Sequence, residues 1–290
     1  MRLDDQAESG NVEDRRGRLP VGRGAGLGLF GVLAVLALAW FTGIDPGALL
    51  GVLDGVQDTA PPVQQTPAGP PPAADDPQAM FVKKVLKTTE ISWGQIFAQS
   101  GRRYAEPTLV LYDGRVDSAC GLASAAVGPF YCSADSKVYL DLSFFRELTR
   151  RFGAPGDFAQ AYVVAHEIGH HVQNLLGISD QVTAAQQRAR SEREANAYSV
   201  PFELQADCLA GVWGSSQRDL LDPGDVEEGL RAAAAIGDDT IQKRSEGYVA
   251  PESWTHGSSE MRVRWLRRGL ETGDPKACDT FGSPALTPLR

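Results

Sequence analysis

The chain has 290 residues, a formal net charge of −9 and an isoelectric point near 5.0. This acidic balance disfavours a nucleic-acid partner, because such partners are bound by basic surfaces. The length allows one or two domains with enough apolar residues to bury a core. The cysteines form no C-x-x-C pair, which argues against a thiolate zinc ribbon or a thioredoxin-type motif.

The N-terminal part of the chain contains three segments of different composition. Residues 1–23 are polar and charged without apolar periodicity, and we expect them to be a disordered tail. Residues 24–44 form an uncharged apolar run that is long enough for a transmembrane helix and too long for the apolar part of a cleaved signal peptide. Residues 45–78 are rich in Pro, Ala, Gln and Asp and predict an extended linker.

The charges beside the apolar run predict its orientation. Arg15, Arg16, Arg18 and Arg23 precede the run, whereas no Lys or Arg follows it until Lys83. The positive-inside rule places the N-terminus in the cytoplasm and the rest of the chain outside. We therefore expect a single-pass protein of the cell membrane with an extracytoplasmic domain over residues 79–285.

All four cysteines follow the apolar run, where an oxidising compartment would favour disulfides. A bond between Cys120 and Cys132 would close a short segment, and Cys208 would tie Cys278 to the helix that carries it. The sequence leaves all three pairings open, and four free thiols are the alternative in a reducing compartment.

The domain begins with a mixture of helix and strand patterns and ends in a run of helices. Apolar periodicity predicts one or two helices over 81–98, a strand over 108–112 and a hairpin over 128–142. Strand 138–140 is a candidate edge for binding an extended peptide. Further helices are predicted over 143–152, 157–177, 180–198, 202–213, 222–236 and 257–269. This order indicates an α+β fold, with a small sheet followed by a helical bundle.

An H-E-x-x-H motif, His166 to His170, lies within the predicted helix 157–177. Residues one turn apart place both imidazoles on one face, close enough to bind one metal ion, while Glu167 is free to act on a water molecule. Zinc suits such ligands, and a catalytic zinc site needs three protein ligands and an open position. Gly169 removes a side chain where a second helix would approach. Two imidazoles with a purely structural role are the alternative.

The third metal ligand is predicted on a later helix. Gln173 and Leu176 stand where a metzincin requires Gly and His, which excludes that class. Glu203 and Asp207 share one face of a largely apolar helix, where buried carboxylates need a partner or a metal. Glu203 would complete the ligand set, and Asp207 would accept a hydrogen bond from a ligand histidine. A swapped assignment and a solvated pair of carboxylates are the alternatives.

Other polar residues are weaker candidates. His256 lies in a loop from which it could stabilise an oxyanion, with a capping role at the helix entry as the alternative, and Tyr248 is a weaker candidate for the same role. His171 points about 100° away from its ligand neighbour and is predicted to be structural or to support the ligands. A further set of side chains on the last helix is interpreted as a solvated face, with binding of a substrate carboxylate by any of them as the alternative: Arg262, Arg264, Arg267 and Arg268.

Several ordered motifs resemble the bacterial neutral zinc metallopeptidase family: ACGLASAAVGPFYCSADSKVYLD, AHEIGHHVQ, ELQADCLAGVW, AAAAIGDD and THGSSEMRVRW. The resemblance covers most of residues 80–285. It implies a zincin-like domain behind an N-terminal membrane segment, zinc ligands at His166 and His170, a catalytic Glu167 and a third ligand within ELQAD. The resemblance does not imply a particular substrate.

The sequence thus predicts a membrane-anchored, gluzincin-like zinc metallopeptidase. Its cofactor would be Zn²⁺, with His166, His170 and Glu203 as ligands and Asp207 in support. Its catalytic residues would be Glu167, as general base, and His256, and its substrate would be a peptide or protein. Two alternatives are a non-catalytic, membrane-tethered binding module that contains zinc and a zinc amidase acting on cell-wall peptides. The oligomeric state is not predicted.

Overall fold

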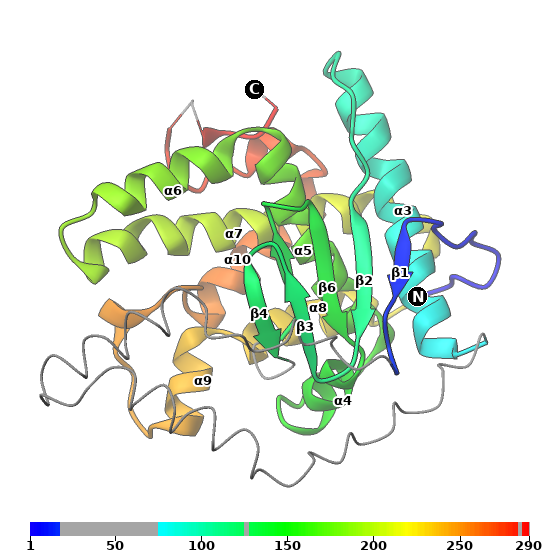
Figure 1. Ribbon diagram of the computed structural model, residues 1–290, viewed down its shortest axis with the longest axis horizontal. Helices are drawn as coiled ribbons and strands as arrows, with labels where there is room; N and C mark the ends of the chain where they lie inside the picture. The colour runs from blue at the N-terminus through cyan, green and yellow to red at the C-terminus, as the bar shows by residue number, and fades with distance from the viewer. Residues whose placement is uncertain (18–74, 125–127, 284–285, 290) are drawn as a thin grey trace, which may run out of the picture. The chain divides into compact units, whose positions relative to one another are not determined.

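The computed structural model describes residues 1–17, 75–124, 128–283 and 286–289 (Figure 1). The predicted transmembrane segment 24–44 lies outside these residues, as does nearly all of the predicted linker 45–78. Within the described ranges, no helix combines the length and the apolar content needed to cross a bilayer. The first 17 residues belong to the same folded unit as the rest of the described chain.

A four-stranded sheet has the strand order β1-β2-β6-β5. Strands β1 (Val12–Asp14), β2 (Thr108–Tyr112) and β6 (Lys137–Asp141) are parallel, and β5 (Phe130–Cys132) is antiparallel to β6. The predicted strand over 108–112 and the predicted hairpin over 128–142 are confirmed. Strands β3 (Arg115–Ser118) and β4 (Gly121–Ser124) form a separate hairpin, which the sequence did not predict.

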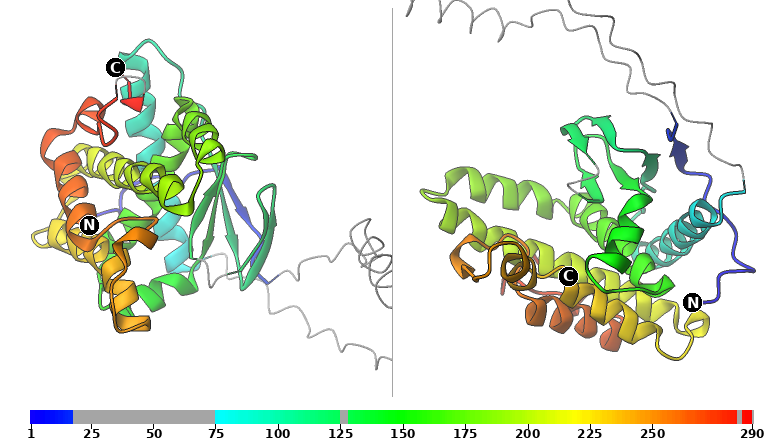
Figure 2. Two further views of the ribbon diagram at one scale, coloured as in Figure 1. Left: turned by 90° about the vertical axis from the view of Figure 1, so that its left-hand side faces the viewer. Right: turned by 90° about the horizontal axis from the view of Figure 1, so that it is seen from below.

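The sheet is covered on both faces, because successive side chains of a strand point to opposite sides. Leu109 and Leu111 of β2 belong to the large core that the helices share. Val110 and Tyr112 of the same strand pack with Val116 of β3 in a smaller cluster. The helices therefore lie on one side of the sheet and the β3–β4 hairpin on the other (Figure 2).

Strand β6 is internal, so the prediction that residues 138–140 form a free edge is wrong. The strand is hydrogen-bonded to β2 along one side and to β5 along the other. A docking peptide would find both rows of backbone groups already paired from Lys137 to Tyr139. The partner β2 is distant in sequence, and such a non-local pairing leaves no local pattern. The sheet edges within the described chain are β1 and β5.

Eight α-helices account for most of the described chain. They are α3 (Pro77–Gln99), α4 (Ser143–Arg150), α5 (Asp157–Leu175), α6 (Ile178–Arg188), α7 (Glu192–Ser216), α8 (Asp225–Ala235), α9 (Asp238–Ser245) and α10 (Ser259–Thr272). The described chain also has three short 3-10 helices: η2 (Arg218–Leu220), η3 (Pro251–Ser253) and, after α10, η4 (Pro275–Ala277). The mixed α+β class predicted from the element order is confirmed.

Helix α7 is a continuous helix of 25 residues with Pro201 inside it. The prediction of two helices, 180–198 and 202–213, is therefore wrong at this junction. An internal proline removes one backbone hydrogen bond and costs about 3 kcal/mol. The second half of α7 is buried almost without interruption from Leu204 to Gly214, and this burial outweighs the cost.

The first 17 residues are ordered, so the predicted disorder of residues 1–23 is wrong for this part. Val12 of β1 pairs with Leu109 of β2, and Leu3 is only 5% exposed. The Met1 α-amino group lies 2.8 Å from an Asp157 oxygen and 3.0 Å from an Asp225 oxygen. The segment has too few apolar residues to form a core of its own. Its apolar side chains instead pack on the core that the rest of the chain forms, and β1 extends the sheet.

The pairing of β1 with β2 also conflicts with part of the predicted topology. A single membrane crossing between residues 17 and 75 would place these two strands on opposite sides of the bilayer. Their hydrogen bonds require them to be on the same side. The paired strands and the predicted single crossing therefore exclude each other, and the location of each part of the chain stays a prediction.

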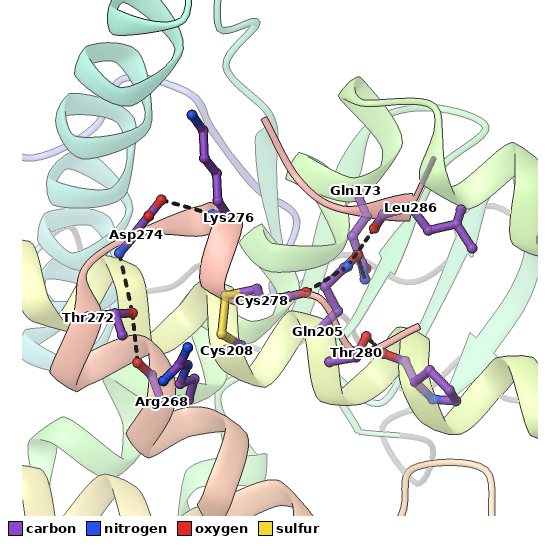
Figure 3. Close-up of a disulfide and its surroundings, with 11 residues drawn as sticks. Gln173, Gln205, Cys208, Arg268, Thr272, Asp274, Lys276, Cys278, Thr280 and Leu286 are labelled. Atoms are coloured by element: carbon purple, nitrogen blue, oxygen red, sulfur yellow. Dashed lines mark hydrogen bonds between the residues drawn. A yellow bond between two sulfur atoms is a disulfide. The ribbon is translucent and has the colours of Figure 1, made fainter. Parts of the chain in front are cut away.

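Two disulfides join all four cysteines, Cys120 with Cys132 and Cys208 with Cys278. The first closes the segment between β3 and β5. The second ties the segment after α10 to the middle of α7 (Figure 3). These are the two pairs that sequence proximity and the helix position suggested, and the structure resolves the pairings that the sequence left open.

Glycines allow α5, α7 and α10 to approach one another closely. A Cβ atom at Gly169 of α5 would lie 2.8 Å from the Ala206 carbonyl oxygen of α7. A Cβ atom at Gly269 of α10 would lie 1.9 Å from the Cys208 carbonyl oxygen, also on α7. The prediction that Gly169 admits a second helix is confirmed. A glycine also allows the close approach of α10 to α7.

We predict that Gly269→Ala destabilises the fold by about 2 kcal/mol or more, because backbone atoms of α7 cannot move aside as a flexible side chain would. The matched control is Gly94→Ala in α3, where a new Cβ meets nothing within 4 Å. That change should stabilise by about 0.5–1 kcal/mol through helix propensity. Denaturant unfolding of both variants measures the difference, and equal midpoints would contradict the close approach.

Candidate metal centre

Three predicted ligands converge between α5 and α7. His166 and His170 lie one turn apart on α5, and Glu203 faces them from α7. One potential ligand atom from each lies within 4.8 Å of the other two. Oε2 of Glu203 is 3.2 Å from Nε2 of His166 and 3.4 Å from Nε2 of His170. The structure thus brings together the set that the sequence proposed, with Glu203 in the third position.

The donor set fits zinc. Tetrahedral zinc with bonds of about 2.0–2.1 Å holds two ligand atoms about 3.3 Å apart. The two distances from Glu203 to the imidazoles have this size. Two imidazole nitrogens and one carboxylate oxygen are also the ligands of one class of catalytic zinc site, which leaves a fourth position open. Ligation itself stays a prediction.

His166 is oriented by the carboxylate predicted for this role. Its Nδ1 lies 2.8 Å from Oδ1 of Asp207, a side chain that is completely buried. An ionised carboxylate can only accept, so Nδ1 carries a hydrogen, and Nε2, which faces Glu203, is the nitrogen left to bind a metal.

Asp207 is in turn held by two residues outside the motif. Arg262 of α10 donates from Nε and Nη2 to the two carboxylate oxygens, both at 2.9 Å. The Tyr162 hydroxyl donates to Oδ1 at 2.6 Å and accepts from Arg262 at 3.1 Å. The interpretation of Arg262 as part of a solvated face is wrong, because the residue is 2% exposed. A buried carboxylate and a buried guanidinium compensate each other here.

His170 is oriented differently, by the side-chain amide of Gln173. Its Nδ1 lies 2.9 Å from Oε1 of Gln173 on the same helix. The Gln173 amide nitrogen donates to the Phe202 carbonyl at 2.8 Å and to Oε1 of Gln205 at 3.0 Å. With both of its hydrogens used, Gln173 must turn its oxygen toward His170. His170 therefore also carries its hydrogen on Nδ1 and presents Nε2 to the metal position.

The amide of Gln205 is fixed by the segment that follows α10. Its nitrogen donates to the Cys278 carbonyl at 3.0 Å and to the Leu286 carbonyl at 2.9 Å (Figure 3). Only its oxygen remains to accept from Gln173. The hydrogen bonds thus run from the disulfide-tied segment through two glutamines to a metal-ligand candidate.

The carboxylates of Glu203 and Asp207 shift the protonation of the centre. Burial lowers the pKa of His166, but Asp207 and Glu203 outweigh it and raise that pKa to about 10. Burial raises the pKa of Glu203, but His170 and His166 hold it well below its usual range. Both carboxylates of the centre therefore stay ionised, and the potential that favours a proton on the imidazole also favours a divalent cation.

Glu167 lies at the wall of a cavity of about 690 Å³ that His166 also lines. The side chain is not part of the ligand cluster. Burial raises the pKa of the Glu167 carboxyl group, although His166 and His170 oppose this effect. A carboxylate with a raised pKa, facing a cavity beside a metal position, is suited to accept and return a proton.

The remaining candidates have different surroundings. His256 also lines the cavity, with 48% of its side chain exposed and Nδ1 3.3 Å from Oδ1 of Asp238. Tyr248 is 63% exposed and does not line the cavity. His171 is buried between Tyr131 and the Ala105 carbonyl, and burial lowers its pKa to about 4. His171 is thus a neutral side chain that joins α5 to the sheet.

Sequence reasoning missed three residues of the centre. Gln173 follows His170 by three positions on a helix, and this spacing is a local signal that could have identified it. Tyr162 precedes His166 by four positions and offered the same signal. Arg262 comes from a helix 55 residues beyond Asp207, and nothing local indicates the pairing.

The fold and the candidate metal centre define an α+β protein with a possible metal site made of two histidines and one glutamate. The chain belongs to the family whose model is described as "Putative neutral zinc metallopeptidase", which matches residues 1–281. It is 46% identical over 296 residues to "Uncharacterized protein YpfJ" of Escherichia coli (strain K12), covering 97% of this chain and 99% of that protein. It is 41% identical over 265 residues to "Uncharacterized protein Rv2575" of Mycobacterium tuberculosis (strain ATCC 25618 / H37Rv), covering 86% of each. No solved structure shows a significant match.

We predict that Gln173→Ala weakens zinc binding by about 10- to 100-fold, because His170 loses the acceptor that fixes its tautomer. Gln181→Ala on α6 is the matched control, since Gln181 bonds only to a carbonyl at an exposed position. Competition with a chromogenic chelator measures both affinities. Equal affinities for the two variants would show that the Gln173 contact does not support the metal.

Proposed function

We propose that the chain is a gluzincin-like zinc peptidase, with His166, His170 and Glu203 as the ligands. The observation that carries the proposal is the convergence of these three side chains, together with the position of His166 and Glu167 at the wall of one cavity. A site with a purely structural metal has no use for a buried carboxylate that is not a ligand and faces a cavity. Membership in the metallopeptidase family supports the same class of reaction.

In this mechanism the protein contributes orientation and proton transfer. Zinc, when bound, would polarise the scissile carbonyl and lower the pKa of a water molecule. Glu167 would accept the proton of the attacking water and deliver it to the leaving amine. His256, which also lines the cavity, would donate a hydrogen bond to the developing oxyanion. Asp207 and Gln173 would hold the two imidazoles in the tautomer that leaves Nε2 free.

We predict that Glu167→Gln lowers kcat by about 10²- to 10⁴-fold while the bound zinc is retained. The amide keeps the size of the side chain but cannot accept the proton. The control is Glu246→Gln at the exposed end of α9, which should leave kcat unchanged. Hydrolysis of a denatured protein and zinc content are measured on both variants. Full activity of Glu167→Gln would overturn the mechanism, and activity without zinc would overturn the metal assignment.

We also propose an extracytoplasmic location for the folded unit. Two disulfides join all of its cysteines, and such bonds persist in oxidising compartments. Residues 1–17 would share this compartment because β1 pairs with β2. Attachment to the membrane through residues 24–44 stays a prediction from the sequence.

The location predicts the redox state of the cysteines in cells. Alkylation of the native protein, unfolded without reductant, should label none of the four cysteines, and labelling after reduction should reach all four. Mass spectrometry of the alkylated protein gives the count. Labelling of all four thiols without reductant would indicate a reducing compartment.

A further inference from the structure

The cavity beside Glu167 is lined by many residues that have no part in proton transfer. Its volume of about 690 Å³ is within the range of sites that bind small ligands or peptide side chains. Apolar side chains form much of the wall: Pro129, Phe144, Phe152, Val163, Ile236 and Ile241. They come from the sheet side, from α4 and α5, and from the α8–α9 region. Such a wall would accept a bulky apolar side chain of a bound peptide.

Two arginines line the same cavity near Phe152. Arg244 of α9 donates from Nη1 to the backbone carbonyls of Arg151 and Phe152, at 3.1 and 3.4 Å. Arg151, at the end of α4, has its guanidinium carbon 5.7 Å from the centre of the Phe152 ring. The two cations are therefore held at one place, where the segment after α4 meets α9.

These two cations have no ionic partner within the part of the chain that the structure describes. No described carboxylate lies within 4.0 Å of either guanidinium, although Glu147 and Glu167 line the same cavity. Arg262 also lines the cavity, but Asp207 compensates its charge. Both side chains are exposed to solvent, and their guanidinium groups therefore have donors available for an anion that enters the cavity.

We propose that the cavity binds a peptide segment in which a bulky apolar residue is accompanied by a carboxylate, with Arg151 and Arg244 as the carboxylate subsite. Guanidinium groups bind carboxylates through paired, charge-assisted hydrogen bonds. The carboxylate is either the C-terminal group of the peptide or an acidic side chain. That such a peptide is also cut rests on the proposed function, whereas its binding does not.

The test measures binding in the zinc-loaded Glu167→Gln protein, so that turnover does not interfere. The probes are acetyl-Ala-Leu-Phe with a free C-terminus, the same peptide amidated, and amidated acetyl-Ala-Leu-Phe-Asp. We expect at least one carboxylate-bearing probe to bind about 5- to 20-fold more tightly than the plain amide, with the difference falling as salt increases. A preference for the first assigns the C-terminal carboxylate, and one for the third assigns the side chain. Equal affinities for all three overturn the proposal.

The arginines are tested by substitution. Arg151→Gln should remove most of the carboxylate preference, and it breaks no hydrogen bond that the Arg151 side chain makes within the described chain. Arg244→Gln should do the same, and thermal unfolding shows whether the loss of its carbonyl contacts affects the fold. Arg150→Gln is the matched control, because Arg150 is the neighbouring exposed residue and does not line the cavity. An equal loss of preference in Arg150→Gln and Arg151→Gln would show a general charge effect and overturn the subsite.

The outcome is separable from that of the proposed function. Binding that depends on Arg151, in a protein whose wild type cleaves no peptide, supports the subsite and contradicts the peptidase. Cleavage without any carboxylate preference supports the peptidase and contradicts the subsite.

Discussion

The buried carboxylate of Asp207 is the interaction on which the candidate centre depends most. It accepts hydrogen bonds from His166 and Tyr162 of α5 and from Arg262 of α10, while its own backbone belongs to α7. A lone charge at this depth would cost several kcal/mol, and so would a lone guanidinium. Each is tolerated because the other is present. Helices α5, α7 and α10 are therefore joined by these four side chains. The burial of each polar group is tolerated because the others supply its hydrogen bonds.

The two ligand candidates of α5 are held by chemically different partners. His166 faces an anion, which orients the ring and also makes Nε2 a stronger donor to a metal. His170 faces a neutral amide, which orients the ring with a much smaller effect on its basicity. Among the groups that hold the two imidazoles, only Glu203 and Asp207 add negative charge, and the Arg262 cation offsets part of it. This balance keeps the site attractive to a divalent cation without leaving several buried charges uncompensated.

The parts of the structure that the sequence predicted are those set by local spacing. His166 and His170 share a helix face because they are four residues apart, and Glu203 and Asp207 do so for the same reason. Local patterns also predicted β2 and the β5–β6 hairpin. The failures arise from contacts between distant segments: the β1–β2 pairing, the internal position of β6, the passage of α7 through Pro201 and the burial of Arg262. Each depends on burial or pairing energy that only the assembled fold supplies.

The disulfide between Cys208 and Cys278 has a consequence for the order in which the molecule matures. The carbonyls of Cys278 and Leu286 hold Gln205, which holds Gln173, which orients His170. The chain must therefore be synthesised past these residues, more than 100 positions beyond the H-E-x-x-H motif, before His170 has its final orientation. Closure of this disulfide keeps the late segment in place. Metal acquisition would then follow oxidation in time, so that a nascent chain carries the motif without the activity that the finished protein would have.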